Sequence, residues 1–416
     1  MTHRRPLVRV AAALLLVPAA LALRPRADDP LLQLREIATP ALPGAGQQNL
    51  AVGPDGRVYF SWVDRLPDSS HALRFAVLGG GATWSQPRTI AAGRDWFVNW
   101  ADFPSVAALG ERDLAAHWLQ KSGRGTYSYD VRLSRTADGG ATWSAPVTPH
   151  RDATATEHGF AALWAMPGGT LAAVWVDGRK HALADTTHRE MVLRATTLSA
   201  ASELGAEVEL DDRICDCCQT AAAQTADGPV VVYRDRSPGE IRDIGIVRLV
   251  NGTWTAPRLV AEDGWQINAC PVNGPAVAAE GRRVVVAWFT GAANTRRVEL
   301  AFSDDAGASF AAPAVVDDGR PVGRVAVVLL EGGAALVSWL EDTATGAEVR
   351  VRRVATSGER GAAMTVARTA AGRPSGFPRM VRAGDRVVFA WRDPEGNGGA
   401  LVRTAVARVA GTASGD

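Results

Sequence analysis

The chain has 416 residues, of which 47% are hydrophobic and 21% are charged, so it can bury a large globular core. Its 45 basic and 44 acidic residues leave a net charge of +1. Because the two signs are mixed along the sequence, there is no basic stripe of the kind that nucleic-acid-binding proteins use, and we expect no nucleic acid partner.

The first residues predict a removable export signal. Arg4, Arg5 and Arg9 precede an apolar stretch from Val10 to Leu23, which ends on the small-x-small pattern at residues 20–22. At about fourteen residues this stretch is too short to span a bilayer comfortably. We therefore expect residues 1–22 to be a signal peptide and the mature protein to be soluble, periplasmic or secreted, with no membrane insertion after cleavage. An uncleaved anchor is the alternative.

An apolar run that ends in a large aromatic residue occurs seven times along the chain. The aromatic residues follow one another at steps of 51 to 58 residues: Trp62, Trp118, Trp175, Tyr233, Trp288, Trp339 and Trp391. A repeat of this length, made of short strands and Gly/Pro/Asp turns, is typical of β-propeller blades. We predict an all-β fold, with one β-propeller domain over residues 31–410. Seven four-stranded blades are expected, with six as the alternative.

The two ends of the predicted domain complement each other. The last repeat runs out of sequence near Val409 after three strands, whereas the segment from Leu31 to Ile37 precedes the first repeat and belongs to no other blade. We predict that this N-terminal strand completes the last blade. Such closure removes the exposed sheet edges that promote aggregation.

Two turns carry a recognisable motif. Residues 136–143 read Thr-Ala-Asp-Gly-Gly-Ala-Thr-Trp, and residues 303–310 read Ser-Asp-Asp-Ala-Gly-Ala-Ser-Phe. Both resemble the Asp-box, or BNR repeat, of the sialidase (neuraminidase) superfamily of β-propellers. In such a turn the aspartate accepts N–H bonds, the glycine takes a positive φ, and the aromatic ring fills the gap between sheets. The motif points to a fold and not to an activity.

The resemblance implies what an active sialidase would need: three arginines for the substrate carboxylate, a Tyr nucleophile with a Glu base, and an Asp acid/base. The segment Asp227 to Arg234 resembles the family's Asp-Gly turn and the strand after it, which ends in an arginine. Counting back from that turn, the family's Glu falls near Gln219, which cannot act as a base. None of the four tyrosines lies in the late blades, where the family places its nucleophile. An ordinary sialidase is therefore not expected.

All four cysteines fall in two loops of one predicted face. On this top face, the loops that lead into each first strand meet the loops that leave each second strand. Cys215, Cys217 and Cys218 precede the fourth blade, and Cys270 precedes the fifth. Because Cys218 and Cys270 are almost one repeat apart, they occupy equivalent places in adjacent blades, and we expect all four sulfurs to lie together.

Three interpretations of this cluster are open. An even number of cysteines in an exported chain favours two structural disulfides. Three cysteines within four residues make tidy pairing awkward, and soft sulfur ligands favour a Cu(I) or Zn(II) site, with His158 of the preceding blade as a nitrogen ligand. A redox-active disulfide is the third interpretation. Copper or zinc is thus the cofactor that the sequence suggests.

A charged cluster follows the second strand of the fourth blade. It supplies the catalytic candidates Arg234, Asp235, Arg236 and Glu240. These groups can form a solvated salt-bridge network, or an arginine can bind a carboxylate, sulfate or phosphate. The side chains expected to contact a ligand nearby are Trp96, Trp100, Asp177, Arg179, Gln219, Tyr233, Arg242, Trp265, Asn268 and Asn273.

The leading hypothesis is an exported monomer whose top face binds a ligand, with a binding or metal-handling function centred on the cysteines. The alternative is a glycoside hydrolase, of exo-sialidase type or specific for acidic glycans, with a nonstandard pair such as Asp235 and Glu240. Tryptophans on the same face could then stack on sugar rings. A scaffold for protein interactions is the third hypothesis.

Overall fold

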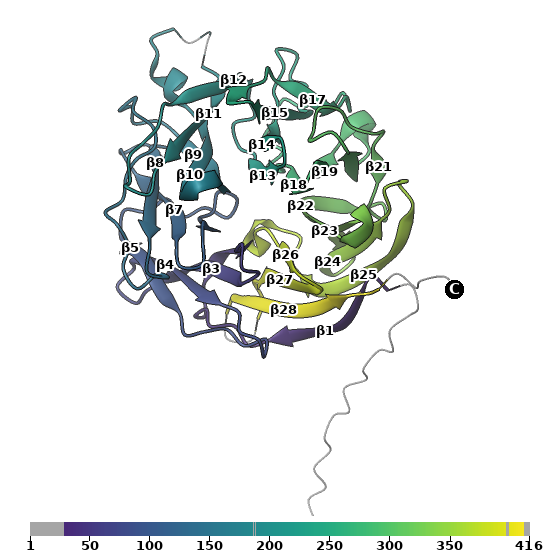
Figure 1. Cartoon of the computed structure of the whole chain (residues 1–416). Coiled ribbons are helices and arrows are strands. Elements are labelled where there is room, and N and C mark those ends of the chain that lie inside the picture. Colours follow the sequence, from purple (N-terminus) through teal and green to yellow (C-terminus); the bar gives the residue numbers. More distant parts are fainter. Residues whose placement is uncertain (1–28, 186, 188, 397–398, 412–416) are drawn as a thin grey trace, which may run out of the picture.

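The computed structural model describes residues 29–411 except 186, 188 and 397–398. In this part of the chain, seven antiparallel sheets are arranged in a ring around a central axis (Figure 1). The prediction of an all-β, seven-bladed propeller is confirmed, and the six-bladed alternative is wrong. The predicted signal peptide, residues 1–22, lies outside the described residues. No helix among the described residues is both long and apolar enough to cross a membrane.

The first four blades are built from consecutive strands. The first has β2 (Gly46–Val52), β3 (Val58–Arg65), β4 (His71–Val77) and β5 (Arg88–Gly93). The second has β6 (Ser105–Ala108), β7 (Leu114–Lys121) and β8 (Tyr129–Thr136), and its fourth strand is reduced to a bridge between Leu133 and Val147. The third has β9 (His158–Met166), β10 (Thr170–Asp177), β11 (Met191–Leu198) and β12 (Val208–Ile214). The fourth has β13 (Ala221–Thr225), β14 (Gly228–Arg234) and β15 (Ile244–Val250), with β16 (Thr253–Trp254) and β17 (Arg258–Ala261) both on β15.

The remaining blades follow the same order. The fifth has β18 (Ala276–Glu280), β19 (Arg283–Thr290), β20 (Arg297–Ser303) and β21 (Ala314–Val315). The sixth has β22 (Pro321–Leu329), β23 (Ala335–Thr343), β24 (Gly346–Val354) and β25 (Arg360–Thr369). The seventh has β26 (Arg379–Ala383), β27 (Arg386–Asp393), β28 (Leu401–Val409) and β1 (Leu31–Ile37). Short 3-10 turns are η1 (Pro167–Gly169), η2 (Arg179–Ala182), η4 (Ala292–Asn294), η5 (Glu331–Gly333) and η6 (Arg373–Ser375).

The N-terminal strand closes the ring as predicted. Strand β1 pairs antiparallel with β28, from Leu31 opposite Val409 to Ile37 opposite Thr404. Figure 1 shows this purple strand along the outer side of the yellow one. Leu31 is 1% exposed and packs in the core between the sixth and seventh blades.

The second strand of each blade is apolar on both faces because a neighbouring blade covers each face. In β10, Val174 and Val176 pack in the cluster shared with the fourth blade. Ala173 and Trp175, which alternate with them, pack in the cluster shared with the second blade. A continuous apolar run in the sequence therefore marks a strand between two sheets.

The turn after β8 shows how the repeated aspartates act. The Asp138 carboxylate accepts two bonds from Thr142, one from the backbone N and one from Oγ1. Gly140 has a φ of +87°, and a Cβ there would lie 2.4 Å from the ring of Phe75 in the first blade. Trp143 packs edge-on against the same ring. The turn thus joins two blades on the side away from the predicted top face.

Candidate functional site

The four cysteines lie together at the boundary of the fourth and fifth blades, and all four are free thiols in this structure. Cys215 Sγ is 2.8 Å from Cys218 Sγ and 4.0 Å from Cys217 Sγ. The three sulfurs lie within 4.8 Å of one another, a spacing at which they could hold a metal ion. Cys215 and Cys218 are buried, Cys217 is half-buried and Cys270 is exposed. The sulfur group, Cys215, Cys217, Cys218 and Cys270, therefore opens to solvent through Cys270.

The thiols of the sulfur group differ in acidity. Burial raises the pKa of Cys215 to about 12. Burial acts in the same direction on Cys218, but hydrogen bonds with Cys215 and Cys217 and the positive charge of Arg234 hold the pKa of Cys218 well below its usual range. The neighbouring Cys217 thiol lowers the pKa of Cys270. Cys218 and Cys270 thus lose their protons more readily than an ordinary cysteine, and the thiolate is the form that binds metal.

Two buried guanidinium groups lie beside these sulfurs. Arg234 is 1% exposed, and its hydrogen bonds go to the backbone carbonyls of Asn273, Arg242 and Phe289. Its guanidinium also lies 4.9 Å from the ring centre of Trp265. Arg234 was predicted as a catalytic residue, but its guanidinium is buried in the protein, where backbone carbonyls of two blades accept a hydrogen bond from each of its three nitrogens.

Arg242 contributes the second buried charge. It is 3% exposed, and its Nη2 donates to Glu240 at 2.7 Å. Its Nε and Nη1 are buried without a hydrogen-bond partner among the described residues. Arg242 lies close enough to Cys215 for the Cys215 thiol to raise the arginine's pKa, although burial opposes that rise. The sulfur group is therefore a place where negative charge is stabilised.

The other catalytic candidates form a rim of ion pairs above the sulfur group. Arg236 donates to Asp216 at 2.9 Å and to Glu240 at 2.9 Å. The hydrogen bond from Arg236 lowers the pKa of Glu240, which therefore remains ionised and is a poor general acid. Burial raises the pKa of Asp235 to about 6. Asp235 and Glu240 are close in sequence, but their environments differ.

A cluster at the first strands of the second and third blades adds groups that the sequence did not single out. Tyr129 Oη lies 2.9 Å from Asp102 Oδ2 and 2.8 Å from Glu157 Oε1. Burial raises the pKa of Asp102 to about 7 and that of Glu157 to about 8. The negative charges of Asp216 and Cys270 contribute to the shift of Glu157, so this carboxyl group lies near the sulfur group.

The predicted ligand-binding residues divide into three sets. Trp96 and Trp265 are core side chains: Trp96 stacks on Trp118, and Trp265 packs on Phe289 and beneath Arg234. Tyr233 and Asn273 are buried and bind Asp211 and the backbone of the sixth blade, respectively. The set that is open to solvent or to the axis is Trp100, Gln219 and Asn268.

Three further predicted residues lie elsewhere. His158, expected as a metal ligand with the cysteines, faces Asp152, Asp177 and Asp130 instead. Asp177 accepts bonds from the Trp175 indole and from Arg179, so neither residue of this pair points toward a ligand at the sulfur group. Asp177 is 0% exposed, and its carboxylate satisfies the indole N–H of Trp175 inside the blade core.

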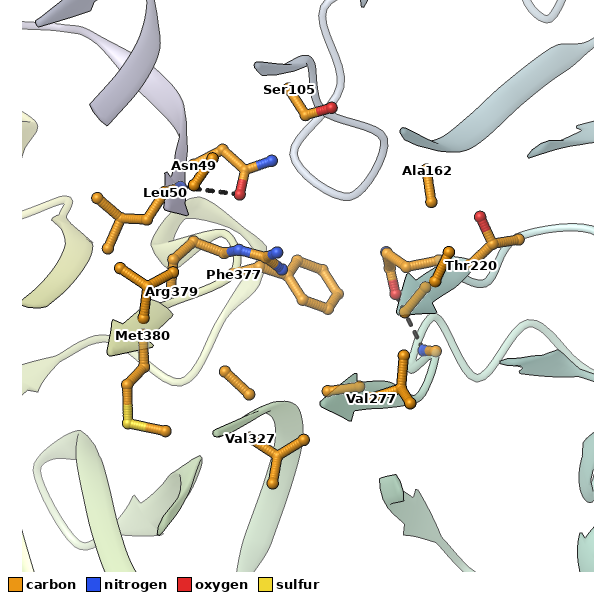
Figure 2. Close-up of a pocket in the computed structure, with 18 of the residues that line it drawn as sticks. Asn49, Leu50, Ser105, Ala162, Thr220, Val277, Val327, Phe377, Arg379 and Met380 are labelled. Carbon is orange, nitrogen blue, oxygen red and sulfur yellow. Dashed lines mark hydrogen bonds between the residues drawn. The ribbon is translucent and has the colours of Figure 1, made fainter. Parts of the chain in front are cut away.

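The axis of the propeller holds a cavity of about 520 Å³, lined by the first strands of all seven blades. Figure 2 shows Asn49, Thr220 and Arg379 facing this space together with apolar side chains such as Val277 and Val327. Gln219 lies at one end of the cavity, where its side chain donates a hydrogen bond to Ala101 O and accepts one from Gly274 N. Asp102 also lines the cavity, so the carboxyl cluster opens into the axis.

No protein-family model matches the sequence, and no curated protein matches it. Similar solved structures include a protein of unknown function from Dyadobacter fermentans DSM 18053, at 12% identity and a TM-score of 0.50 over 91% of this chain and 99% of that one. They also include the Hadza microbial sialidase Hz136, at 15% identity and a TM-score of 0.42 over 72% and 63% of the two chains. The α-L-arabinofuranosidase Arb93A from Fusarium graminearum is 14% identical, with a TM-score of 0.48 over 91% and 97%. The fold of this chain is a seven-bladed β-propeller, and these likenesses bear on the fold alone.

Proposed function

We propose that this protein is an exported metal-binding propeller whose sulfur group takes up Cu(I). The observation that carries the proposal is the convergence of three thiols beside the buried cations Arg234 and Arg242. Among the described residues, the contact of Arg242 with Glu240 is the only direct contact of either cation with a carboxylate. A cuprous site with two or three thiolates carries a net negative charge, which these cations would stabilise. Exposed Cys270 gives the ion a route from solvent.

The test is an anaerobic titration of the reduced, full-length mature protein with Cu(I) in competition with a chromophoric Cu(I) chelator. The wild type should bind Cu(I), and the Cys217→Ser/Cys218→Ser variant should bind it more than about 100-fold more weakly, since losing ligands costs more than the 10- to 100-fold typical of their supporting groups. His181→Ala, which removes an exposed histidine that is not grouped with the sulfurs, is the matched control. Equal Cu(I) affinity in the wild type and the cysteine variant would refute the proposal, as would two disulfides that re-form at once after reduction.

A glycoside hydrolase is the second candidate, and the cluster of Tyr129, Asp102 and Glu157 favours it. Two carboxyl groups with raised pKa values beside a cavity are what a general acid needs at neutral pH. Hydrolysis of a panel of aryl sialosides, uronides and arabinofuranosides tests this candidate. A turnover that Glu157→Gln abolishes and Cys218→Ser preserves would assign the chemistry to the carboxyl groups; no turnover on any substrate would leave the metal-binding function.

A further inference from the structure

A pair of stacked histidines lies at the boundary of the second and third blades, apart from the sulfur group. His150 follows β8 and its bridge, and His158 begins β9. Their rings are parallel, with centroids 3.7 Å apart and an interplanar angle of 3°. His150 is 6% exposed and His158 is fully buried. Two imidazoles at this depth need partners for all four ring nitrogens.

One nitrogen of His150 and both nitrogens of His158 lack a hydrogen bond among the described residues. His150 Nε2 and His158 Nδ1 are buried and accept or donate no hydrogen bond among the described residues, and the same holds for Asp130 Oδ1. The three atoms lie close together: Asp130 Oδ1 is 3.7 Å from His150 Nε2 and 3.8 Å from His158 Nδ1. In a tetrahedral zinc site with bonds of about 2.1 Å, ligand atoms lie roughly 3.4 Å apart. The unsatisfied atoms thus converge at nearly the spacing of a metal's ligands.

The opposite nitrogens meet the carboxylate of Asp152. Its Oδ1 is 3.1 Å from His150 Nδ1, and its Oδ2 is 3.3 Å from His158 Nε2. Protons on these two nitrogens leave the lone pairs of the two rings on the side of Asp130. A carboxylate behind each histidine is the arrangement that orients imidazoles in metal sites. Arg179 holds this carboxylate, with Nη2 3.5 Å from Asp152 Oδ1.

The charge around the pair also favours a cation. Three carboxylates, those of Asp130, Asp152 and Asp177, lie within 4 Å of the two rings, against the single guanidinium of Arg179. The side chain of Asp130 is 23% exposed although its Oδ1 is buried, so this carboxylate lies between the buried ring nitrogens and solvent. An ion can therefore reach the cluster past Asp130.

We propose that Asp130, His150 and His158 bind one first-row divalent cation of the Zn(II) type, at a site independent of the sulfur group. Parallel stacked rings cannot both direct in-plane lone pairs at one ion. Binding therefore turns one imidazole about its Cβ–Cγ bond and opens the stack. Two imidazoles and a carboxylate are ligands that zinc and its neighbours prefer, whereas Cu(I) prefers the thiols.

Cobalt(II) distinguishes the two sites in one spectrum. Titration of the full mature chain should show weak d–d bands from the histidine site, while thiolate binding adds intense sulfur-to-cobalt charge-transfer bands. The d–d bands should persist in Cys217→Ser/Cys218→Ser and in His181→Ala, and Zn(II) should displace them. Asp130→Asn and His150→Gln should weaken this binding by more than about 100-fold, and Asp152→Asn by about 10- to 100-fold. Unchanged affinity in Asp130→Asn, or no d–d bands in the wild type, would overturn the proposal.

A second measurement, thermal unfolding with and without Zn(II), also applies to variants that are less stable than the wild type. Because an ion that binds only the folded state stabilises it, Zn(II) should raise the midpoint of thermal unfolding of the wild type and of the cysteine variant. Each protein is compared with its own metal-free state, so the shift in midpoint caused by Zn(II) can be measured even in a destabilised variant. Asp130→Asn introduced into the cysteine variant should show no such rise. A stacked pair that only holds a proton would give the cysteine variant the same midpoint with and without Zn(II), and the proposal would fail whether or not the sulfur group binds Cu(I).

Discussion

A single tyrosine hydroxyl separates two carboxyl groups beside the axial cavity. The Tyr129 hydroxyl has one proton, yet its oxygen is within hydrogen-bond distance of both Asp102 and Glu157. One carboxyl group must therefore carry a proton of its own and donate it to the tyrosine oxygen. The raised pKa values of both carboxyl groups agree with a proton held in this cluster near neutral pH.

Replacement of Asp102 by Asn should flatten the dependence of stability on pH. A folded-state pKa of about 7, above the value near 4 of an unfolded aspartate, gives a contribution that is complete at low pH and is lost as the pH rises from about 4 through 7. The slope that Asp102 contributes is at most about 1.4 kcal/mol per pH unit. Asn keeps the acceptor for Phe160 N and stays neutral, so denaturant midpoints of Asp102→Asn should change less between pH 5 and 8.

Asp95→Asn is the control for this experiment, because Asp95 is an exposed aspartate a few residues away. Its pH profile should match that of the wild type. Identical slopes for Asp102→Asn and the wild type would mean that Asp102 is ionised throughout the range, and the shared proton would have to be abandoned.

The sequence did not predict the roles of two side chains, Asp177 and Tyr129. The tryptophans of the repeat are buried. Several of them donate their indole N–H to a carboxylate two residues later, as Trp175 does to Asp177. That spacing looked like a ligand-binding aspartate because sequence alone does not show which face of a strand end points to the core. Tyr129 was overlooked for the opposite reason, since its partners lie in two other loops that only the ring brings together.

At the scale of elements, the turn between β20 and β21 can be tested with two adjacent aspartates. Asp305 accepts hydrogen bonds from Ser309 N, Ser309 Oγ and Ser303 Oγ. Asp304 is exposed and makes only a long ion pair at 3.8 Å. Asp305→Ala should lower the free energy of unfolding by about 1 kcal/mol, as the loss of a capping side chain does. Asp304→Ala should leave it within about 0.5 kcal/mol of the wild type.

The pH dependence of this pair gives a second check. Burial opposes ionisation of Asp305, but its hydrogen bonds with Ser309 and Ser303 hold its pKa at about 2. A lowered pKa stabilises the folded state above the unfolded value near 4, and this stability is lost as the pH falls toward 2. The difference between the wild type and Asp305→Ala should therefore shrink below pH 4. A constant difference would show that packing, and not the carboxylate, is responsible.

Elements were predicted well because their pattern is local and repeated. The apolar run before each aromatic predicts the second strand, and the closing strand followed from counting strands in the last repeat. The loops were predicted less well. His158 lies at the start of a first strand, as the cysteines nearly do, but alternation along β9 turns its ring toward the neighbouring blade and away from the sulfur group.

At the scale of the whole molecule, the ring depends on one strand that is far from its blade in sequence. Strand β1 covers the edge of β28 and buries Leu31 between the sixth and seventh blades. It also supplies the carbonyl of Ile37, which accepts a hydrogen bond from Thr404 Oγ1, a fully buried side chain. Without β1, the nine-residue strand β28 would become the outer edge of the seventh blade.

A chain that begins at residue 38 should therefore lose more than the stability of one strand. Its open edge at β28 should pair with other copies, so size-exclusion chromatography should show oligomers or aggregates, and thermal unfolding should begin at a lower temperature than in a chain that begins at residue 29. The chain that begins at residue 29 keeps β1 and should behave as a monomer, which makes it the matched control. A monomeric, equally stable chain without residues 29–37 would mean that the ring holds together through contacts between blades alone. Closure by β1 would then be needed neither for the fold nor for protection against aggregation.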